Sequence, residues 1–393
     1  MARVAPSAIM ALLKQAAGGG FINLASGLPD AALFPHETIR ALADDVLTRD
    51  WKAALQYGPA EGHPPLRDFV AELMRRRGVA ATAENLLITS GSQQALDLAA
   101  RAFVERGSVV SIESPSYLAA IQTFDSYEVD YAAAPLDDDG VRDDVLIANL
   151  RHAAGSGRVF QYLLPNFQNP TGLTLSVDRR MRIAEGAADL QLPLLEDDAY
   201  YDLRYEGAAL PPLAALADNP LAQYTGTFSK TIAPGLRVGW VFGSPEVIAK
   251  LAQLKQITDL HSGSLTQRLA FEFCARGHLE PQIAKLCEAY RAKRDVMLNA
   301  LHRTMPDGMT WTRPRGGMFV FVTMPAGVDA DVLLQRALER KLMFVPGRPF
   351  FPRNSSSEST GGNTLRLNFV SPPSDEIARG VEVLAELLRS GEP

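Results

Sequence analysis

From about residue 85 to residue 245, short β-rich runs alternate with segments of helical pattern, and each run ends at polar, glycine or proline residues. A chain that repeats strands and helices in this way forms a largely parallel α/β sheet. Ligands bind such sheets just outside the strand ends, so the polar residues there are the candidates for chemistry. The predicted strands are Leu86–Thr89, Val109–Ile112, Val159–Leu164, Pro193–Leu195 and Val238–Phe242.

The rest of the chain predicts a second, smaller α+β domain, as suits a length of 393 residues. A long helix over about 281–303 leaves the sheet region and is followed by strands at Met318–Val322 and Leu365–Phe369. Further helices are expected over about 7–15, from about 35, over about 330–340 and up to about 389, with a Ser- and Gly-rich loop over 354–363. We expect an N-terminal arm with part of the small domain over 1–45, a large domain over 46–285 and a small domain over 286–393.

Several function classes do not suit this composition. The chain has no run of about 18 apolar residues, which argues against a membrane span. Its net charge is −6 with scattered basic residues, unlike a nucleic-acid binder. Residues 1–6 lack the apolar core of a secretion signal, so a cytoplasmic location is expected. Cys274 and Cys287 are expected to be reduced, and the six dispersed histidines predict no metal site.

The most informative segment runs from Thr227 to Trp240. Lys230 lies among hydroxyl side chains, and Arg237 follows it seven residues later, just before an apolar strand. A buried lysine has a lowered pKa and is a good nucleophile for a carbonyl carbon. The hydroxyls and Arg237 are suitable donors for a phosphate dianion. Alone, the segment is also compatible with a surface lysine in a turn.

Three other strand ends carry polar residues. Glu196-Asp197-Asp198-Ala199-Tyr200 places an acid where a ligand would lie, although an acidic loop without a role is the alternative. The segment 166–172, Asn-Phe-Gln-Asn-Pro-Thr-Gly, is composed of turn formers. Thr89–Gln94 joins a strand to a helix, and its backbone N–H groups with Ser92 offer a phosphate seat or merely a helix cap.

Together these segments resemble the fold-type I pyridoxal-phosphate (PLP) aminotransferases of classes I and II, over essentially the whole chain. The phrases at 55–62, 90–96 and 314–319 are similar to those of the α-aminoadipate/kynurenine-type subgroup, which also includes the catalytic domains of MocR-like regulators. The resemblance implies the PLP-dependent transferase fold type I, with a mainly parallel, seven-stranded type of sheet in the large domain. It also implies a homodimer.

The resemblance implies a role for each candidate residue. The catalytic residues are Lys230, which would hold PLP as a Schiff base and move the Cα proton, Asp197, which would pair with the ring nitrogen, and Tyr200. Tyr200 and Asn169 would bond the ring's phenolic oxygen, and Tyr117 would stack on the ring. The phosphate would be held by Ser92, Gln93, Thr227, Ser229, Arg237 and, across the dimer interface, Tyr57. The substrate carboxylate would bind Arg366, Asn169 and the backbone at Gly27.

One departure from the subgroup concerns the substrate. Members that accept 2-aminoadipate carry an arginine in a Ser-x-Ile-Arg phrase, where this chain has Ser7-Ala8-Ile9-Met10. Without that charge we expect neutral, hydrophobic or aromatic L-amino acids as donors and a 2-oxo acid as acceptor. Two alternatives remain. Other PLP reactions (β-elimination, decarboxylation, oxidation) use the same residues. The second alternative is a PLP-sensing regulator domain of the MocR type. It is disfavoured because those regulators carry a winged-helix segment before the aminotransferase-like part, whereas here the resemblance begins within the first ten residues.

Overall fold

The computed structural model describes residues 19–155, 157–353 and 360–390. In this part of the chain the largest sheet has eight strands in the order β2-β9-β8-β7-β6-β3-β4-β5. Strands β8, β7, β6, β3 and β4 are parallel neighbours, whereas β2, β9 and the two-residue β5 pair antiparallel. The expected mainly parallel sheet is therefore confirmed, with the short β5 added to seven longer strands. The bounds are β2 Leu86–Thr89, β3 Val109–Ser114, β4 Asp130–Asp137, β5 Gly140–Val141, β6 Val159–Leu163, β7 Leu194–Asp197, β8 Ala222–Thr227 and β9 Gly239–Phe242.

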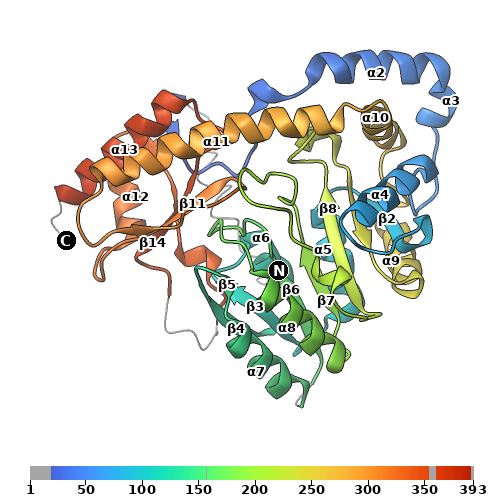
Figure 1. The fold of residues 1–393 in the computed structure, drawn as a ribbon, viewed down its shortest axis with the longest axis horizontal. Coiled ribbons are helices and arrows are strands. Elements are labelled where there is room, and N and C mark those ends of the chain that lie inside the picture. The colour runs from blue at the N-terminus through green and yellow to red at the C-terminus, as the bar shows by residue number, and fades with distance from the viewer. Residues whose placement is uncertain (1–18, 156, 354–359, 391–393) are drawn as a thin grey trace.

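Helices cover both faces of this sheet (Figure 1). One face is buried under α5 and α6 through Leu96, Ile121 and Phe124, and the other under α7 and α8 through Leu146 and Ile183. Near the β2–β9 edge, α2, α4 and α10 enclose a further apolar cluster. The helices of this part are α2 His36–Arg49, α3 Trp51–Ala54, α4 Pro64–Arg76, α5 Ser92–Phe103, α6 Leu118–Asp125, α7 Asp143–Ala154, α8 Val177–Asp189, α9 Pro245–Asp259 and α10 Ser264–Ala275, with one-turn 3-10 helices at Ala31–Leu33, Ala83–Asn85, Leu213–Ala215 and Pro234–Leu236.

A second body is built around a four-stranded antiparallel sheet in the order β10-β11-β14-β13 and a two-stranded parallel pair, β1 with β12. Its core is one apolar cluster that includes residues of α11, α12 and α13. The pairing of Ile22 with Leu342 brings the described N-terminal segment into this body. The bounds are β1 Ile22–Asn23, α11 Leu279–Thr304, β10 Thr310–Trp311, β11 Phe319–Thr323, α12 Ala330–Glu339, β12 Leu342–Met343, β13 Val345–Pro346, β14 Thr364–Asn368 and α13 Ser374–Arg389, with a 3-10 helix at Arg348–Phe350.

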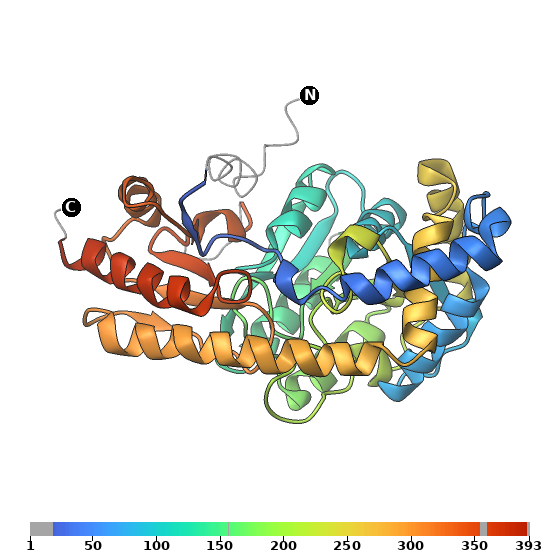
Figure 2. The same cartoon turned by 90° about the horizontal axis from the view of Figure 1, so that it is seen from above.

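The 26-residue helix α11 joins the two bodies. Its first residue, Leu279, packs in the cluster of α2, α4 and α10, whereas Leu286 and Leu301 pack in the core of the second body. Figures 1 and 2 show this helix running from α10 to the far end of the molecule, alongside α13. The predicted domain limits at 45/46 and 285/286 fall inside α2 and α11, so the division of the chain stays a proposal.

Most predicted elements lie within a few residues of their expected positions. The strands β4 and β8 were not among the runs singled out in the sequence, because β4 is rich in alanine and β8 in polar residues. The expected helix at 7–15, with Met10, lies outside the described residues, as does part of the 354–363 loop. None of the helices in the described ranges is both long and apolar enough to cross a membrane.

Candidate active site

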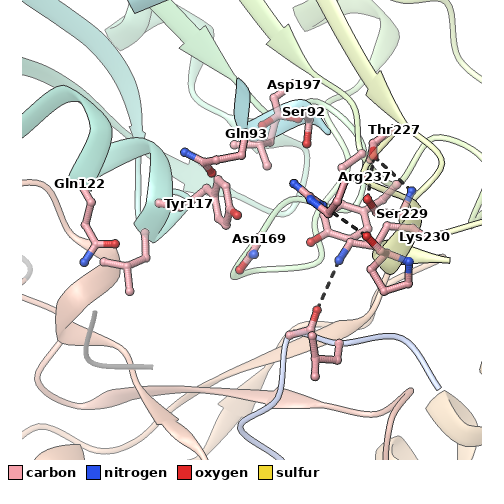
Figure 3. A pocket seen from close by; sticks show the side chains of 18 of the residues that line it. Ser92, Gln93, Tyr117, Gln122, Asn169, Asp197, Thr227, Ser229, Lys230 and Arg237 are labelled. Atoms are coloured by element: carbon pink, nitrogen blue, oxygen red, sulfur yellow. Dashed lines mark hydrogen bonds between the residues drawn. The ribbon is translucent and has the colours of Figure 1, made fainter. Parts of the chain in front are cut away.

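A cavity of about 350 Å³ lies at the carboxyl ends of the parallel strands, between the two bodies. Figure 3 shows its polar side chains arriving from β7, the start of α5, the loop after β8 and the segment after β6. The structure brings together in this pocket twelve of the thirteen residues singled out in the sequence: Gly27, Ser92, Gln93, Tyr117, Asn169, Asp197, Tyr200, Thr227, Ser229, Lys230, Arg237 and Arg366.

Lys230 lies in the loop that follows β8, with its amine inside the pocket. Nζ donates a weak hydrogen bond to the carbonyl oxygen of Gly27, 3.4 Å away, drawn as a dashed line in Figure 3. Loss of hydration lowers the pKa of Lys230 to about 8, and the positive charges of Arg237 and Arg366 act in the same direction, opposed by Asp197. About a tenth of this amine is thus neutral, and nucleophilic, at pH 7, far more than for a lysine in water.

Asp197 is the last residue of β7 and is buried. Its Oδ2 accepts a hydrogen bond of 2.8 Å from the hydroxyl of Tyr162, whereas Oδ1 has no hydrogen-bond partner among the described residues. Burial raises the pKa of Asp197 to about 7, and the negative charge of Asp198 raises it too. The hydrogen bond from Tyr162 and the positive charge of Lys230 act in the opposite direction and lower this pKa. A cationic N–H group in the pocket would both satisfy Oδ1 and stabilise the carboxylate.

The segment from Ser90 to Gln93 and Arg237 form a cradle for an anion. Gly91 has φ +82° and directly precedes the 12-residue helix α5, and the first N–H groups of a helix have no partners within the helix and are available to an anion. Arg237, itself at φ +52°, reaches back so that its Nη2 donates to the carbonyl oxygen of Ser90 over 3.0 Å. A Cβ on Gly91 would lie 2.5 Å from that Nη2, so only glycine allows this approach.

Hydroxyl groups complete the cradle. Thr227 donates from Oγ1 to Oγ of Ser229 over 2.9 Å, and its Oγ1 accepts from the backbone N–H of Ser229. Gln93 extends from the first turn of α5, and its Nε2 donates to Oγ1 of Thr123 over 3.2 Å. The cradle therefore combines a helix N-terminus, an arginine and two hydroxyls, which is a donor set that suits a phosphate.

Arg366 enters the pocket from β14 of the second body. Its Nη1 donates to Oδ1 of Asn169 over 3.0 Å and its Nη2 to the carbonyl oxygen of Ala25 over 2.9 Å. The guanidinium lies 4.2 Å from the centre of the Phe319 ring. It is buried, and no carboxylate pairs with it in the described part of the chain. Burial lowers the pKa of Arg366 to about 10, and a bound carboxylate would offset the missing hydration.

Two tyrosines flank the pocket. Tyr117 precedes α6, and Tyr200 is buried with its ring edge-on to Phe319. Burial raises the pKa of Tyr117 to about 12 and also raises the pKa of Tyr200. Both phenols therefore keep their protons near neutral pH and are available as hydrogen-bond donors.

Tyr57 is the one predicted site residue that does not line this pocket. Its side chain is 76% exposed, and its ring lies edge-on to His261 at 5.6 Å. The sequence-based hypothesis assigns it to the neighbouring subunit's site, and that role stays a prediction.

The sequence reasoning missed two kinds of site residue. Tyr162, which bonds Asp197, was seen only as part of a strand, because strand register does not follow from the sequence. Leu28, Leu118, Ala119 and Gln122 also line the pocket. Leu118 and Ala119 directly follow Tyr117 and Gln122 lies five residues after it, and this proximity in the sequence was the one available signal.

With this geometry in place, comparison with known proteins defines the class. Residues 20–384 match the family of class I and II aminotransferases. The chain belongs to this family, and it is a PLP-dependent aminotransferase of fold type I, in the α-aminoadipate/kynurenine-type subgroup.

Individual relatives agree with this assignment. The chain is 40% identical to the aromatic-amino-acid aminotransferase 1 of Thermococcus litoralis, over 98% of this chain and 91% of that protein. It is also 40% identical to the 2-aminoadipate transaminase of Thermus thermophilus, over 98% and 95% of the two chains. The crystal structure of the Pyrococcus horikoshii kynurenine aminotransferase in complex with PMP superposes with a TM-score of 0.93 at 39% identity, covering 98% of this chain and 95% of that one.

Proposed function

We propose that this aminotransferase moves the amino group of neutral, hydrophobic or aromatic L-amino acids to a 2-oxo acid, with the pocket residues in the roles given below. One observation carries the proposal, namely that three polar groups face one cavity. They are the amine of Lys230, the Oδ1 of Asp197 that has no hydrogen-bond partner among the described residues, and the guanidinium of Arg366, which has no carboxylate partner among them. When bound, PLP supplies an aldehyde for covalent attachment and a ring that accepts the electron pair left at the substrate Cα.

The donor set of the pocket fits this cofactor. Ser92, Gln93, Ser229 and Arg237, with Thr227 behind them, form the anion cradle and would hold the phosphate. Asp197 would meet the ring nitrogen through Oδ1, Tyr200 and Asn169 would face the phenolic oxygen, and Tyr117 would cover the ring. Lys230 lies among these groups, and its lowered pKa means that the amine loses its proton easily. A residue that takes the proton from Cα and later returns it needs this property.

Arg366 and Asn169 position the substrate. The two guanidinium nitrogens Nη1 and Nη2 already contact Asn169 and the backbone near Gly27, so an α-carboxylate bound there would be held in a fixed orientation. Fixing the carboxylate directs the Cα–H bond toward Lys230, and such positioning is a large part of enzymatic rate enhancement.

The charges of the pocket support neutral donors. Three cationic side chains, Lys230, Arg237 and Arg366, are among its described lining residues, and each has a role already. The described lining residues include no further cation for a second carboxylate, whereas Leu28, Leu118 and Ala119 offer apolar contacts. Steady-state kinetics with leucine, phenylalanine and 2-aminoadipate test this preference. Strong selectivity for 2-aminoadipate would refute it.

Lys230→Ala tests the assignment of the site. The variant is expected to lose turnover and the visible absorbance of covalently attached PLP. Lys341→Ala is the matched control, because Lys341 lies against Phe21 outside the pocket. A Lys230→Ala protein with full activity would overturn the site assignment.

The homodimer with Tyr57 acting across the interface is also part of the proposal. Tyr57 belongs to a set of large, exposed apolar side chains on α3, the loop after it and the end of α9: Trp51 52%, Leu55 67%, Tyr57 76%, Ile257 82% and Leu260 56% exposed. Exposed apolar side chains in such number are typical of an interface with a partner. A mixture of Lys230→Ala and Tyr57→Ala subunits should regain activity that neither has alone, because each mixed dimer carries one intact site. A mixture that stays at the sum of its parts would contradict this arrangement.

A further inference from the structure

The hydrogen bond between Tyr162 and Asp197 follows from the register of two parallel strands. Tyr162 of β6 pairs with Leu195 of β7, so Asp197 lies two residues further along the neighbouring strand. Side chains alternate between the faces of a sheet, which puts Tyr162, Leu195 and Asp197 on the same face. The tyrosine hydroxyl thus reaches diagonally to Oδ2 of Asp197, 2.8 Å away.

The position of the Tyr162 hydroxyl is fixed by packing. Its side chain is fully buried, with its ring edge-on to Phe124 at 5.7 Å, and it does not line the pocket. The two oxygens of Asp197 therefore differ: Oδ2 is held from behind by Tyr162, while Oδ1 has no protein partner in the described residues. A carboxylate held by one oxygen cannot turn freely about its Cβ–Cγ bond.

We propose that Tyr162 is a positioning residue of this aminotransferase: its hydroxyl holds Asp197 so that Oδ1 stays directed at the ring nitrogen of the cofactor. This inference rests on the proposed role of Asp197. Tyr162 touches neither cofactor nor substrate and acts only through the carboxylate.

The same hydrogen bond also favours the charged form of Asp197, because it lowers a pKa that burial raises. Without the hydroxyl, the pKa of Asp197 rises further, and more of the carboxyl is neutral near pH 7. A neutral carboxyl is a poor partner for a protonated ring nitrogen. The ionisable groups near Asp197 come from every element around it: Tyr162, Asp198, Lys230, Glu113, Tyr117 and Tyr200.

Tyr162→Phe removes the hydroxyl and keeps the ring. The dissociation constant of PLP is measured by quenching of protein fluorescence as PLP is added to the apoenzyme, and kcat is measured against pH. We expect PLP to bind roughly 10-fold more weakly, as for loss of one hydrogen bond to a charged group. The acidic limb of kcat should move upward by about one pH unit, with the KM for the amino acid little changed.

The matched control is Tyr131→Phe. Tyr131 is a buried tyrosine of the same apolar cluster, and its hydroxyl donates to Oδ1 of Asp125 over 2.9 Å, away from the pocket. Both variants lose a tyrosine–aspartate hydrogen bond, so their thermal midpoints show the structural cost alone. Weaker PLP binding in both variants to the same degree would overturn the inference.

A double-mutant cycle separates the inference from the proposed function. Asp197→Asn should weaken PLP binding, and adding Tyr162→Phe to it should weaken binding no further, since the tyrosine acts through the carboxylate. If Asp197→Asn has no effect, the proposed role of Asp197 fails. If Asp197→Asn has its effect and Tyr162→Phe has none, the inference about Tyr162 alone is wrong.

Discussion

Arg366 and Asn169 meet inside the pocket, with Nη1 of the arginine 3.0 Å from Oδ1 of the asparagine, although they belong to different bodies of the fold. Arg366 comes from β14 of the small sheet, and Asn169 from the segment after β6 of the large one. A substrate carboxylate bound to both would therefore contact both bodies at once.

Arg366→Lys tests this contact. Lysine keeps the charge but loses the planar pair of donors, so we expect kcat/KM for the amino acid and for the 2-oxo acid to fall about 100-fold or more. Arg340→Lys, whose guanidinium pairs with Glu386 on the surface, is the control and should leave kcat/KM unchanged. Equal losses in the two variants would contradict the role of Arg366.

The lowered pKa of Lys230 predicts a pH dependence for uptake of the cofactor. The neutral amine is the reactive form, so the rate of covalent PLP attachment to the apoenzyme should rise with pH and level off above about 8. At pH 7 about a tenth of the amine is then neutral, far more than for a lysine in water. Stopped-flow absorbance after mixing apoenzyme with PLP measures this rate. A rate that still rises steeply at pH 10 would show that the lysine is not perturbed.

Gly91→Ala should weaken PLP binding through Arg237. The added Cβ meets Nη2 of Arg237 at 2.5 Å, so the guanidinium must move away from the cradle. Gly107→Ala is matched to it, because Gly107 has φ +80°, close to the +82° of Gly91, and nothing within 4 Å of its added Cβ. Both variants carry the backbone strain of a residue with a side chain at positive φ, about 1–3 kcal/mol, but Gly91→Ala alone should raise the PLP dissociation constant, by roughly 10-fold or more. Fluorescence titration of both apoenzymes with PLP measures the two dissociation constants, and equal constants would contradict this explanation.

Glu113 predicts an effect on stability. Burial raises the pKa of this carboxyl from 4.5 to about 8, although the N–H of Leu164 donates to Oε2 over 3.0 Å. The folded state therefore binds a proton that the unfolded state releases, so this contribution is present below about 4.5 and is lost as pH rises toward 8. Glu113→Gln removes the titration and should stabilise the protein at pH 8 relative to wild type, on the order of a few kcal/mol.

Thermal unfolding of the two proteins from pH 5 to pH 8 measures the Glu113 effect. The difference in midpoint should grow with pH in favour of Glu113→Gln. The exposed Glu288→Gln on α11 serves as control and should show no such trend. A constant difference across the range would refute the explanation.

The sequence alone was sufficient for the parts of the site that lie in short, contiguous phrases. Lys230 and Arg237 stand seven residues apart around a single turn, and Asp197 and Tyr200 end one strand, so their neighbourhood is local. Tyr162 could not be found this way, because its contact with Asp197 depends on the register of β6 against β7. The strand β8 is buried by its neighbours rather than by its own hydrophobicity, and β4 is rich in alanine and only partly buried. The site of Met10, and with it the substrate preference inferred there, lies outside the described residues.

The pairing of β1 with β12 has a consequence for biosynthesis. Ile22 is held by Leu342, and the carbonyl of Ala25 accepts its hydrogen bond from Arg366, 341 residues later. These early residues can take their places only after almost the whole chain has left the ribosome. The large sheet can form during translation, whereas the part of the pocket that contains Arg366 and Gly27 can form only after translation is almost complete. A truncated or stalled chain would thus carry Lys230, the proposed residue for cofactor attachment, without Arg366, the proposed residue for the substrate carboxylate.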